Sequence, residues 1–401
     1  MNLRRTFRSK YDGIRYYRSR HEFDALCMTQ RLPSDNDSLG DVLSWLEMAQ
    51  NIYSHGGVSA AWFLLRKEWG LPYPETTGYI IRTMIRASEF TGSSVYVERA
   101  RRMGDYLISL QENDGGYRNA TEAKISAPVI FNTGQIIIGM CILSNYLNDM
   151  RYLDSAYCAG KWLTNLLDSD GAWRRSTHQG PKAYHARVAW SLAMLAHHLE
   201  DHKFISTAER SLHWIMGNLR KDFWFDNMGL EGPIQPAYLH SIAYTYRGIF
   251  ECAMLGCGDV ENSLKVVWSF LEKMNQLAVV RKGCLPGAFS EGWIPDDSYS
   301  CLTGNAQTVV LMQRYAILCG VKPYSVAIRA MLDYLKRAQA TVTQTGINEC
   351  HGGLPGSWPL KGKYCPYMIP NWAAKFFADS LLIHLAGEDV ISRFSKGITK
   401  R

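Results

Sequence analysis

The sequence predicts an all-α protein, an (α/α)6 toroid in which six helical hairpins close into a ring. Three observations support this fold class. A glycine-containing turn recurs along the chain, a polar or aromatic cluster follows each turn, and an apolar stretch of helical length follows each cluster. Such repetition indicates a repeat architecture, and twelve helices close a ring without open ends. An open solenoid is the alternative, but it needs polar caps at its ends, which the sequence does not show.

The glycine-containing turns vary in quality. In chain order, the six copies lie at residues 56–58, 111–117, 170–173, 228–230, 283–289 and 353–358. The clearest, at residues 111–117, reads Gln-Glu-Asn-Asp-Gly-Gly-Tyr, and the least regular is Met228-Gly229-Leu230. An amphipathic stretch precedes each turn, so we expect each turn to end one helix of a hairpin and lead to the next.

The polar or aromatic clusters supply one marker residue for each repeat. The markers are Tyr79, Asn132, His185, His240, Asn305 and Asn371. Successive markers are about 53 to 66 residues apart, and this spacing is long enough for two helices and two loops. We therefore expect two helices in each repeat, with the polar cluster at the start of the second one.

The two helices of a repeat differ in composition. Residues 95–112 and 204–219 are amphipathic, whereas residues 136–147 and 188–195 are almost wholly apolar. A helix that is apolar on all sides is buried, so the apolar stretches predict inner helices and the amphipathic ones outer helices. We expect the first outer helix to start near the N-capping pair Asp37-Ser38. The predicted boundaries are a basic N-terminal arm over residues 1–35, the toroid over 36–387 and a tail over 388–401.

The net charge of +7 is concentrated in the arm. The first twenty residues contain Arg4, Arg5, Arg8, Lys10, Arg15, Arg18 and Arg20, against Asp12. The arm is either a solvated segment or a patch that contacts anionic lipid headgroups or an anionic glycan. No motif predicts nucleic-acid binding. The start lacks the apolar run of a signal peptide and no stretch reads as membrane-spanning. The sequence therefore predicts a cytoplasmic protein, or one peripheral to the membrane through the arm.

The turn at residues 111–117 resembles a relaxed form of the QW-type repeat of the terpenoid cyclase and protein prenyltransferase α/α-toroid superfamily. The repeat spacing and the Tyr-Pro-Glu-Thr-Thr-Gly-Tyr cluster at residues 73–79 are similar to uncharacterised toroid proteins from bacterial exopolysaccharide gene clusters. This resemblance covers residues 36–387 and implies the toroid fold and a role in polysaccharide biosynthesis. The Asp-x-Asp-Asp motif and the zinc ligands of those enzymes are absent from the sequence, so terpenoid chemistry is not expected.

In such a ring the N-termini of the inner helices meet at one mouth, where unpaired N–H groups and partial positive charge favour an anionic ligand. Amide groups suit sugar hydroxyls and aromatic rings suit sugar faces. The sequence therefore predicts a carbohydrate partner, and an anionic one. The predicted substrate-binding residues are Tyr79, Asn132, Gln135, Asn305, Gln307, Asn371 and Trp372. The alternative is that some of these are polar core residues that satisfy one another between helices.

The predicted catalytic residues are Tyr184, His185, Arg187, Tyr238, His240, Glu75 and Asp297. In one mechanism, Arg187 neutralises a uronate carboxylate and a Tyr or His removes the C5 proton, which gives epimerisation or β-elimination. Toroid polysaccharide lyases use Asn, His, Arg and Tyr in this way, and this set resembles theirs. In a second mechanism, two carboxylates hydrolyse a glycosidic bond as an inverting pair. Glu75 is the candidate acid and Asp297 its partner, with Asp296 and Glu291 as alternatives from the same loop.

A third alternative is a non-catalytic glycan-binding or scaffold toroid, because a fold alone does not establish a function. We expect no cofactor, because the sequence contains no nucleotide-binding fingerprint. We also expect no metal, because the ten Cys lack the CxxC spacing of a zinc site.

Overall fold

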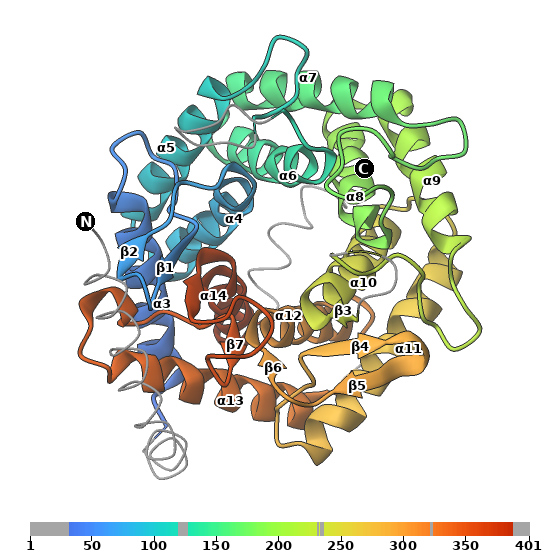
Figure 1. Cartoon of the computed structure of the whole chain (residues 1–401). Coiled ribbons are helices and arrows are strands. Elements are labelled where there is room, and N and C mark those ends of the chain that lie inside the picture. Colours follow the sequence, from blue (N-terminus) through green and yellow to red (C-terminus); the bar gives the residue numbers. More distant parts are fainter. Residues whose placement is uncertain (1–31, 119–126, 231, 233–235, 321–323, 388–401) are drawn as a thin grey trace, which may run out of the picture.

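The computed structural model describes residues 32–118, 127–230, 232, 236–320 and 324–387. Twelve α-helices within these ranges form two concentric rings, one inside the other (Figure 1). The predicted (α/α)6 toroid is therefore confirmed. The predicted tail and all but the last four residues of the predicted arm lie outside the described residues.

The inner helices are α4 (Pro74–Thr91), α6 (Ile130–Leu147), α8 (Ala186–Leu199), α10 (Leu239–Met254), α12 (Leu302–Leu318) and α14 (Asn371–Ala386). The outer helices are α3 (Asp35–Asn51), α5 (Val95–Ser109), α7 (Met150–Leu166), α9 (His202–Met216), α11 (Val260–Val280) and α13 (Ser325–Thr343). Each inner helix packs against the next, and α14 packs against both α4 and α3, which closes the ring. The first outer helix begins slightly earlier than expected, because Ser34 rather than Asp37 or Ser38 caps it.

Burial separates the two rings as the composition predicts. Fifteen residues of α6, from Ile130 to Ser144, are buried, whereas α9 buries a stripe that includes Phe204, Leu212 and Ile215. By length and composition α6 could cross a membrane, yet 83% of it is buried inside the ring. A helix at the core of a folded domain passes the same test, so this finding is weak evidence for a membrane span.

The recurring glycines hold each turn against the next outer helix. Five of them have positive φ, and an added Cβ would lie 2.1–2.4 Å from a backbone oxygen of that helix: Gly56, Gly115, Gly171, Gly283 and Gly352. The last of these packs on Asp41 in α3, so the repeat itself closes on the first helix. A side chain fits at none of these positions without a backbone shift.

The fourth turn corrects the sequence interpretation. The glycine position is taken by Phe223, with φ of 64°. The Arg220 N–H donates to the Trp224 carbonyl, as the Glu112 N–H does to the Gly116 carbonyl in the second repeat. The turn therefore lies before Met228-Gly229-Leu230, and the absence of a glycine from it explains why the sequence pattern missed it.

The glutamine of the repeat pattern has the same structural role in three repeats. Gln50, Gln111 and Gln339 each donate from Nε2 to the carbonyl of the turn glycine and to a carbonyl of the next outer helix. One side chain thus joins the end of a helix, its turn and the neighbouring repeat. Buried carbonyl groups need such partners, which accounts for a polar residue at an inward position.

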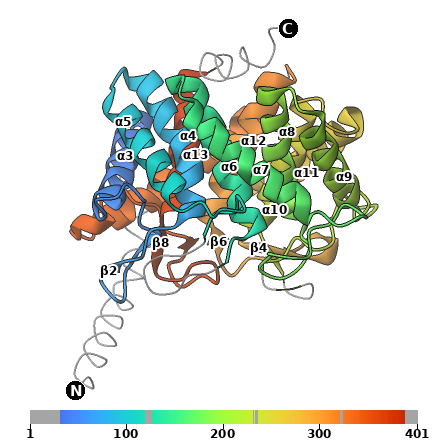
Figure 2. The same cartoon turned by 90° about the horizontal axis from the view of Figure 1, so that it is seen from above.

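Short strands gather at the end of the ring where the inner helices begin (Figure 2). They form two three-stranded sheets and one two-stranded sheet. The strands are β1 (Ala61–Phe63), β2 (Glu68–Trp69), β3 (Ala237–Tyr238), β4 (Ala288–Ser290), β5 (Ile294–Asp296), β6 (Ser300–Cys301), β7 (Ser357–Trp358) and β8 (Met368–Pro370). Pairing of β1 with β8 joins the first hairpin to the last and adds a second closure of the ring.

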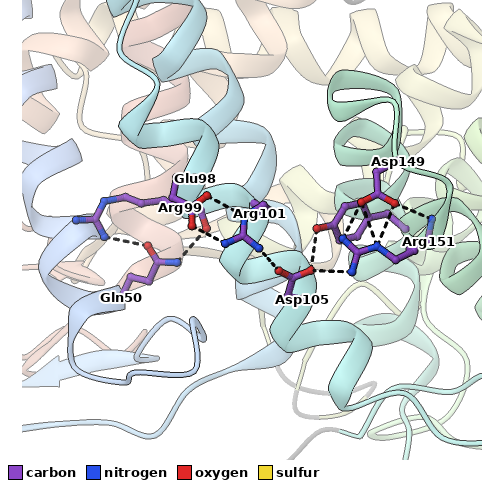
Figure 3. A network of polar contacts seen from close by, with 8 residues as sticks. Gln50, Glu98, Arg99, Arg101, Asp105, Asp149 and Arg151 are labelled. Atoms are coloured by element: carbon purple, nitrogen blue, oxygen red, sulfur yellow. Dashed lines mark hydrogen bonds and ion pairs between the residues drawn. The ribbon is translucent and has the colours of Figure 1, made fainter.

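A network of hydrogen bonds and ion pairs connects outer helices at the surface of the toroid (Figure 3). Arg99 of α5 donates to Gln50 of α3, and Arg101 of α5 pairs with Glu98 and Asp105. Tyr152 of α7 donates to Asp105 as well. Exposed pairs of this kind contribute little each, on the order of 0–1 kcal/mol, so the closure of the ring depends on its buried contacts.

Candidate functional site

A pocket of about 470 Å³ opens at the end of the ring where the inner helices begin. Its walls come from the first turns of α4, α10 and α14, from α6 and from the loop that precedes β8. All six inner helices run in the same direction, so their N-termini share this mouth. The aligned helix dipoles make the mouth favourable for negative charge.

Glu75 is the carboxylate of this pocket. Pro74 starts α4 with its fixed φ, which places Glu75 in the first turn. The Tyr73 hydroxyl donates to Glu75 Oε2 at 2.7 Å. Burial raises the pKa of Glu75 to about 7, although the Tyr73 hydrogen bond and the charge of Arg187 lower it. Such a carboxyl group exchanges a proton near neutral pH and can act as an acid or as a base.

His240 is the second proton-transfer group. It lies in the first turn of α10, with ring centroids 4.2 Å from Tyr244 and 5.2 Å from Tyr364. Burial, and then the charge of Arg187, lower the pKa of His240 to about 3, so its ring is neutral. The Gln307 side-chain amide lies 2.5 Å from His240 Nδ1. If the Gln307 amide N–H donates to Nδ1, the proton of the neutral His240 ring is on Nε2. If the amide is rotated so that its oxygen accepts from Nδ1–H, Nε2 carries no proton and can act as a base.

Aromatic rings form the pocket walls. The Trp372 indole donates to the Tyr364 hydroxyl at 2.8 Å, and Tyr364 meets Tyr238 edge to face at 5.2 Å. Across the pocket, Phe131 meets Tyr184 edge to face at 5.1 Å. Rings fixed by such contacts present flat apolar faces together with hydroxyl groups, a combination that suits a sugar ring.

The floor separates this pocket from the axis of the ring. The Tyr244 hydroxyl lies 3.5 Å from the Tyr79 hydroxyl, and Tyr79 packs on Phe376. Below the floor, the Arg187 guanidinium lies 4.6 Å from the centre of the Tyr244 ring. Arg187 therefore acts on the pocket through its field, because an aromatic ring lies between the two.

The structure places six of the predicted site residues in the pocket wall: Glu75, Tyr79, Tyr184, Tyr238, His240 and Trp372. Eight others do not line it: Asn132, Gln135, His185, Arg187, Asp297, Asn305, Gln307 and Asn371. The predicted site residues therefore do not all line one cavity. The markers do share one end of the ring, because each lies within the first two turns of its inner helix or directly before that helix.

Three of the predicted catalytic residues lie elsewhere. Asp297 is exposed in the loop after β5 and pairs with Arg281. His185 is buried against Trp173, with centroids 6.0 Å apart, because it lies in the single turn of 3-10 helix that precedes α8. Arg187 donates to Gln135 at 2.6 Å below the floor.

The predicted amides serve the framework. Asn371 donates from Nδ2 to the Ser59 carbonyl and to Thr76, and Asn305 donates to the Gly283 carbonyl. Asn305 thus fastens the turn that precedes it to the start of α12, whereas Asn371 fastens the start of α14 to the first repeat. The remaining amides contact other predicted residues or the pocket wall: Gln135 accepts from Arg187, Gln307 contacts His240, and Asn132 contacts Tyr73.

Several pocket residues were missed by the sequence analysis. Tyr244 lies one helical turn after His240, so helical spacing could have identified it. Tyr73 belongs to the cluster that contains Glu75, two residues before it. Tyr364, Lys363 and His178 come from loops outside the repeat pattern, and no periodic signal marks them.

The chain matches no family model and no curated protein. Solved structures, in contrast, resemble it along most of their length. A heparin-specific unsaturated glucuronyl hydrolase has a TM-score of 0.66 at 15% identity, covering 89% of this chain and 98% of its own. The cellobiose 2-epimerase of Bacillus thermoamylovorans has a TM-score of 0.68 at 12% identity, with coverage of 86% and 97%. A polysaccharide lyase has a TM-score of 0.59 at 10% identity, with coverage of 92% and 100%. At these identities the likeness establishes the shared toroid fold.

Proposed function

We propose that this chain is a carbohydrate-active enzyme that transfers protons at a carbon of an acidic sugar, as an epimerase or lyase does. The observation that carries the proposal is that Glu75 and His240 both line one aromatic pocket. The carboxyl group has a pKa of about 7 and the imidazole is neutral. One group can accept the proton while the other donates one, as general acid–base catalysis requires.

Hydrolysis by two carboxylates is less well supported. An inverting pair needs two carboxyl groups roughly 6.5–9.5 Å apart across the scissile bond. Among the described residues that line the pocket, Glu75 is the sole carboxylate, and Asp297 pairs with Arg281 in an exposed loop. The glucuronyl hydrolase, epimerase and lyase neighbours all act on carbohydrates by their names, which supports the substrate class without selecting the reaction.

Three features favour an acidic glycan. The N-termini of six inner helices face the mouth, Lys363 lines the pocket while pairing with Asp296, and the charge of Arg187 acts on Glu75 from below. A carboxylate that enters the pocket would be attracted by all three. A cytoplasmic setting in polysaccharide biosynthesis, and contact of the basic arm with a membrane or an anionic glycan, belong to this proposal and rest on the sequence.

The test is incubation of the purified protein with neutral, uronate-containing and unsaturated uronyl oligosaccharides in deuterated water. Deuterium at a sugar carbon indicates epimerisation, and a new ultraviolet-absorbing product indicates elimination. We expect Glu75→Gln and His240→Ala each to lower turnover by roughly 10²–10⁴-fold. Asp297→Asn is the matched control, because it also removes a predicted catalytic carboxylate, and it should keep full activity. New reducing ends without deuterium at carbon, or full activity in Glu75→Gln, would contradict the proposal.

A further inference from the structure

A layer of buried cations crosses the ring below the floor of the pocket. Four of its members line a small cavity there, together with the acidic residue Asp379: Arg82, Arg187, Arg247 and Lys375. They come from α4, α8, α10 and α14, so four of the six inner helices contribute one cation each. All four side chains are at least nine-tenths buried, with exposed fractions of 3–8%. Arg86 and Arg314, from α4 and α12, are near enough for their charges to act on Arg82.

Glu251 and Asp379 form ion pairs with members of this layer, and the charges of Glu89 and Glu75 act on Arg86 and Arg187. Glu251 pairs with Arg247 at 2.5 Å and with Arg314 at 2.6 Å. Asp379 pairs with Lys375 at 2.8 Å and lies 3.9 Å from Arg86. Burying a charge is unfavourable unless an opposite charge and hydrogen bonds compensate it. The layer therefore carries an excess of buried positive charge.

Arg82 shows where that excess is concentrated. Its Nε is buried and has no hydrogen-bond partner among the described residues. Its contact with Trp190 places the guanidinium carbon 5.7 Å from the ring centre. Arg187, beside it in the cavity, donates to the neutral amide of Gln135. These two guanidinium groups thus lack a carboxylate at ion-pair distance within the described chain.

The size of the cavity limits what can bind there. Its free volume is about 10 Å³, which is room for one water-sized occupant. A sugar carboxylate would have to pass the floor formed by Tyr79, Tyr244 and Phe376. Among inorganic anions a monatomic ion is nearest to this size, and guanidinium groups are weakly hydrated and form buried ion pairs readily.

We propose that the cation layer is a binding site for a single halide-sized anion, chloride being the abundant one, held by Arg82 and Arg187. The ion neutralises charge that the protein leaves uncompensated, and it links α4 to α8 across the axis of the ring. Burial, and then the charges of Arg86 and Arg314, lower the pKa of Arg82. The site is separate from the pocket and does not depend on the proposed reaction.

The first experiment measures thermal unfolding of the full chain in sodium chloride and in sodium gluconate at equal ionic strength. An anion that binds the folded state raises Tm, by about 3 °C at one hundred times its Kd for a chain of this length. Arg82→Met should remove the chloride response while keeping or raising Tm in gluconate, because it removes an uncompensated buried cation. Arg151→Gln is the control: its guanidinium lies on the exposed face of α7, and the variant should respond as the unaltered chain does.

Phosphate and bromide complete the test. Bromide should reproduce the effect of chloride, and crystals soaked in bromide should show an anomalous peak between Arg82 and Arg187. Phosphate, too large for the cavity, should raise Tm no more than gluconate does. Equal Tm in chloride and gluconate, a chloride response that survives Arg82→Met, an equal response to phosphate, or bromide peaks confined to the surface would each overturn the proposal.

Discussion

Glu75→Gln should make the protein more stable at neutral pH while it removes the proposed activity. The side chain is 7% exposed, and its pKa rises from 4.5 to about 7 on folding. Because the folded protein binds this proton more tightly than the unfolded chain, stability is retained below about pH 4.5 and is lost as pH rises towards 7. Glutamine keeps the shape and stays neutral, so it avoids this loss.

The magnitude follows from the size of the shift. At 1.36 kcal/mol per pKa unit, ionised Glu75 costs roughly 3 kcal/mol above pH 7. Urea-induced unfolding of both proteins at pH 5, 6, 7 and 8 measures the difference. We expect the advantage of the Gln variant to be small at pH 5 and to approach this value at pH 8.

Tyr73→Phe provides the matched control. It removes the hydroxyl that donates to Glu75, and this hydrogen bond lowers the pKa of the carboxyl group. The pH range over which stability is lost should therefore move upward in this variant. Stability curves of the unaltered chain and Glu75→Gln that run parallel from pH 5 to pH 8 would refute the assignment of a raised pKa to Glu75.

Two further predictions test the framework. Gly115→Ala should destabilise the fold by several kcal/mol more than Gly92→Ala in the same unfolding assay. Both positions have positive φ, but the new Cβ meets the Cys158 carbonyl oxygen at 2.2 Å in the first and no atom within 4 Å in the second; equal losses would contradict the packing argument. Asn371→Ala should cost about 1–3 kcal/mol, because it leaves the Ser59 carbonyl without this donor; an unchanged unfolding midpoint would remove Asn371 from the framework.

The fold could be predicted because its signals are local and repeated. A turn glycine such as Gly115 is visible in sequence, and the structure shows why it is needed, since the backbone of the next outer helix touches it. The sequence pattern missed the fourth turn because it depends on a glycine, and the residue with positive φ in this turn is Phe223. Tertiary packing stabilises that conformation, and a single sequence does not record it.

The pocket was predicted in part for the same reason. Glu75, Tyr184 and His240 open inner helices, and the closure of the ring brings such positions to one mouth. Position in the repeat does not, however, fix the direction of a side chain. Asn371 and Glu75 both lie in a first turn, yet Asn371 turns back to the loop carbonyls while Glu75 faces the pocket.

The buried cations were not predicted from the apolar composition of the inner helices. Arg82, Arg247 and Lys375 each interrupt a stretch that otherwise reads as buried core, and each alone could be taken for a charge that reaches solvent. Closure of the ring removes that outlet, because these side chains meet around one small cavity between the inner helices. Charges separated by more than a hundred residues in sequence then share one low-dielectric space, where repulsion must be balanced by carboxylates or by a bound anion. Whether the buried charges are balanced can therefore be judged only by adding the charges of all six inner helices.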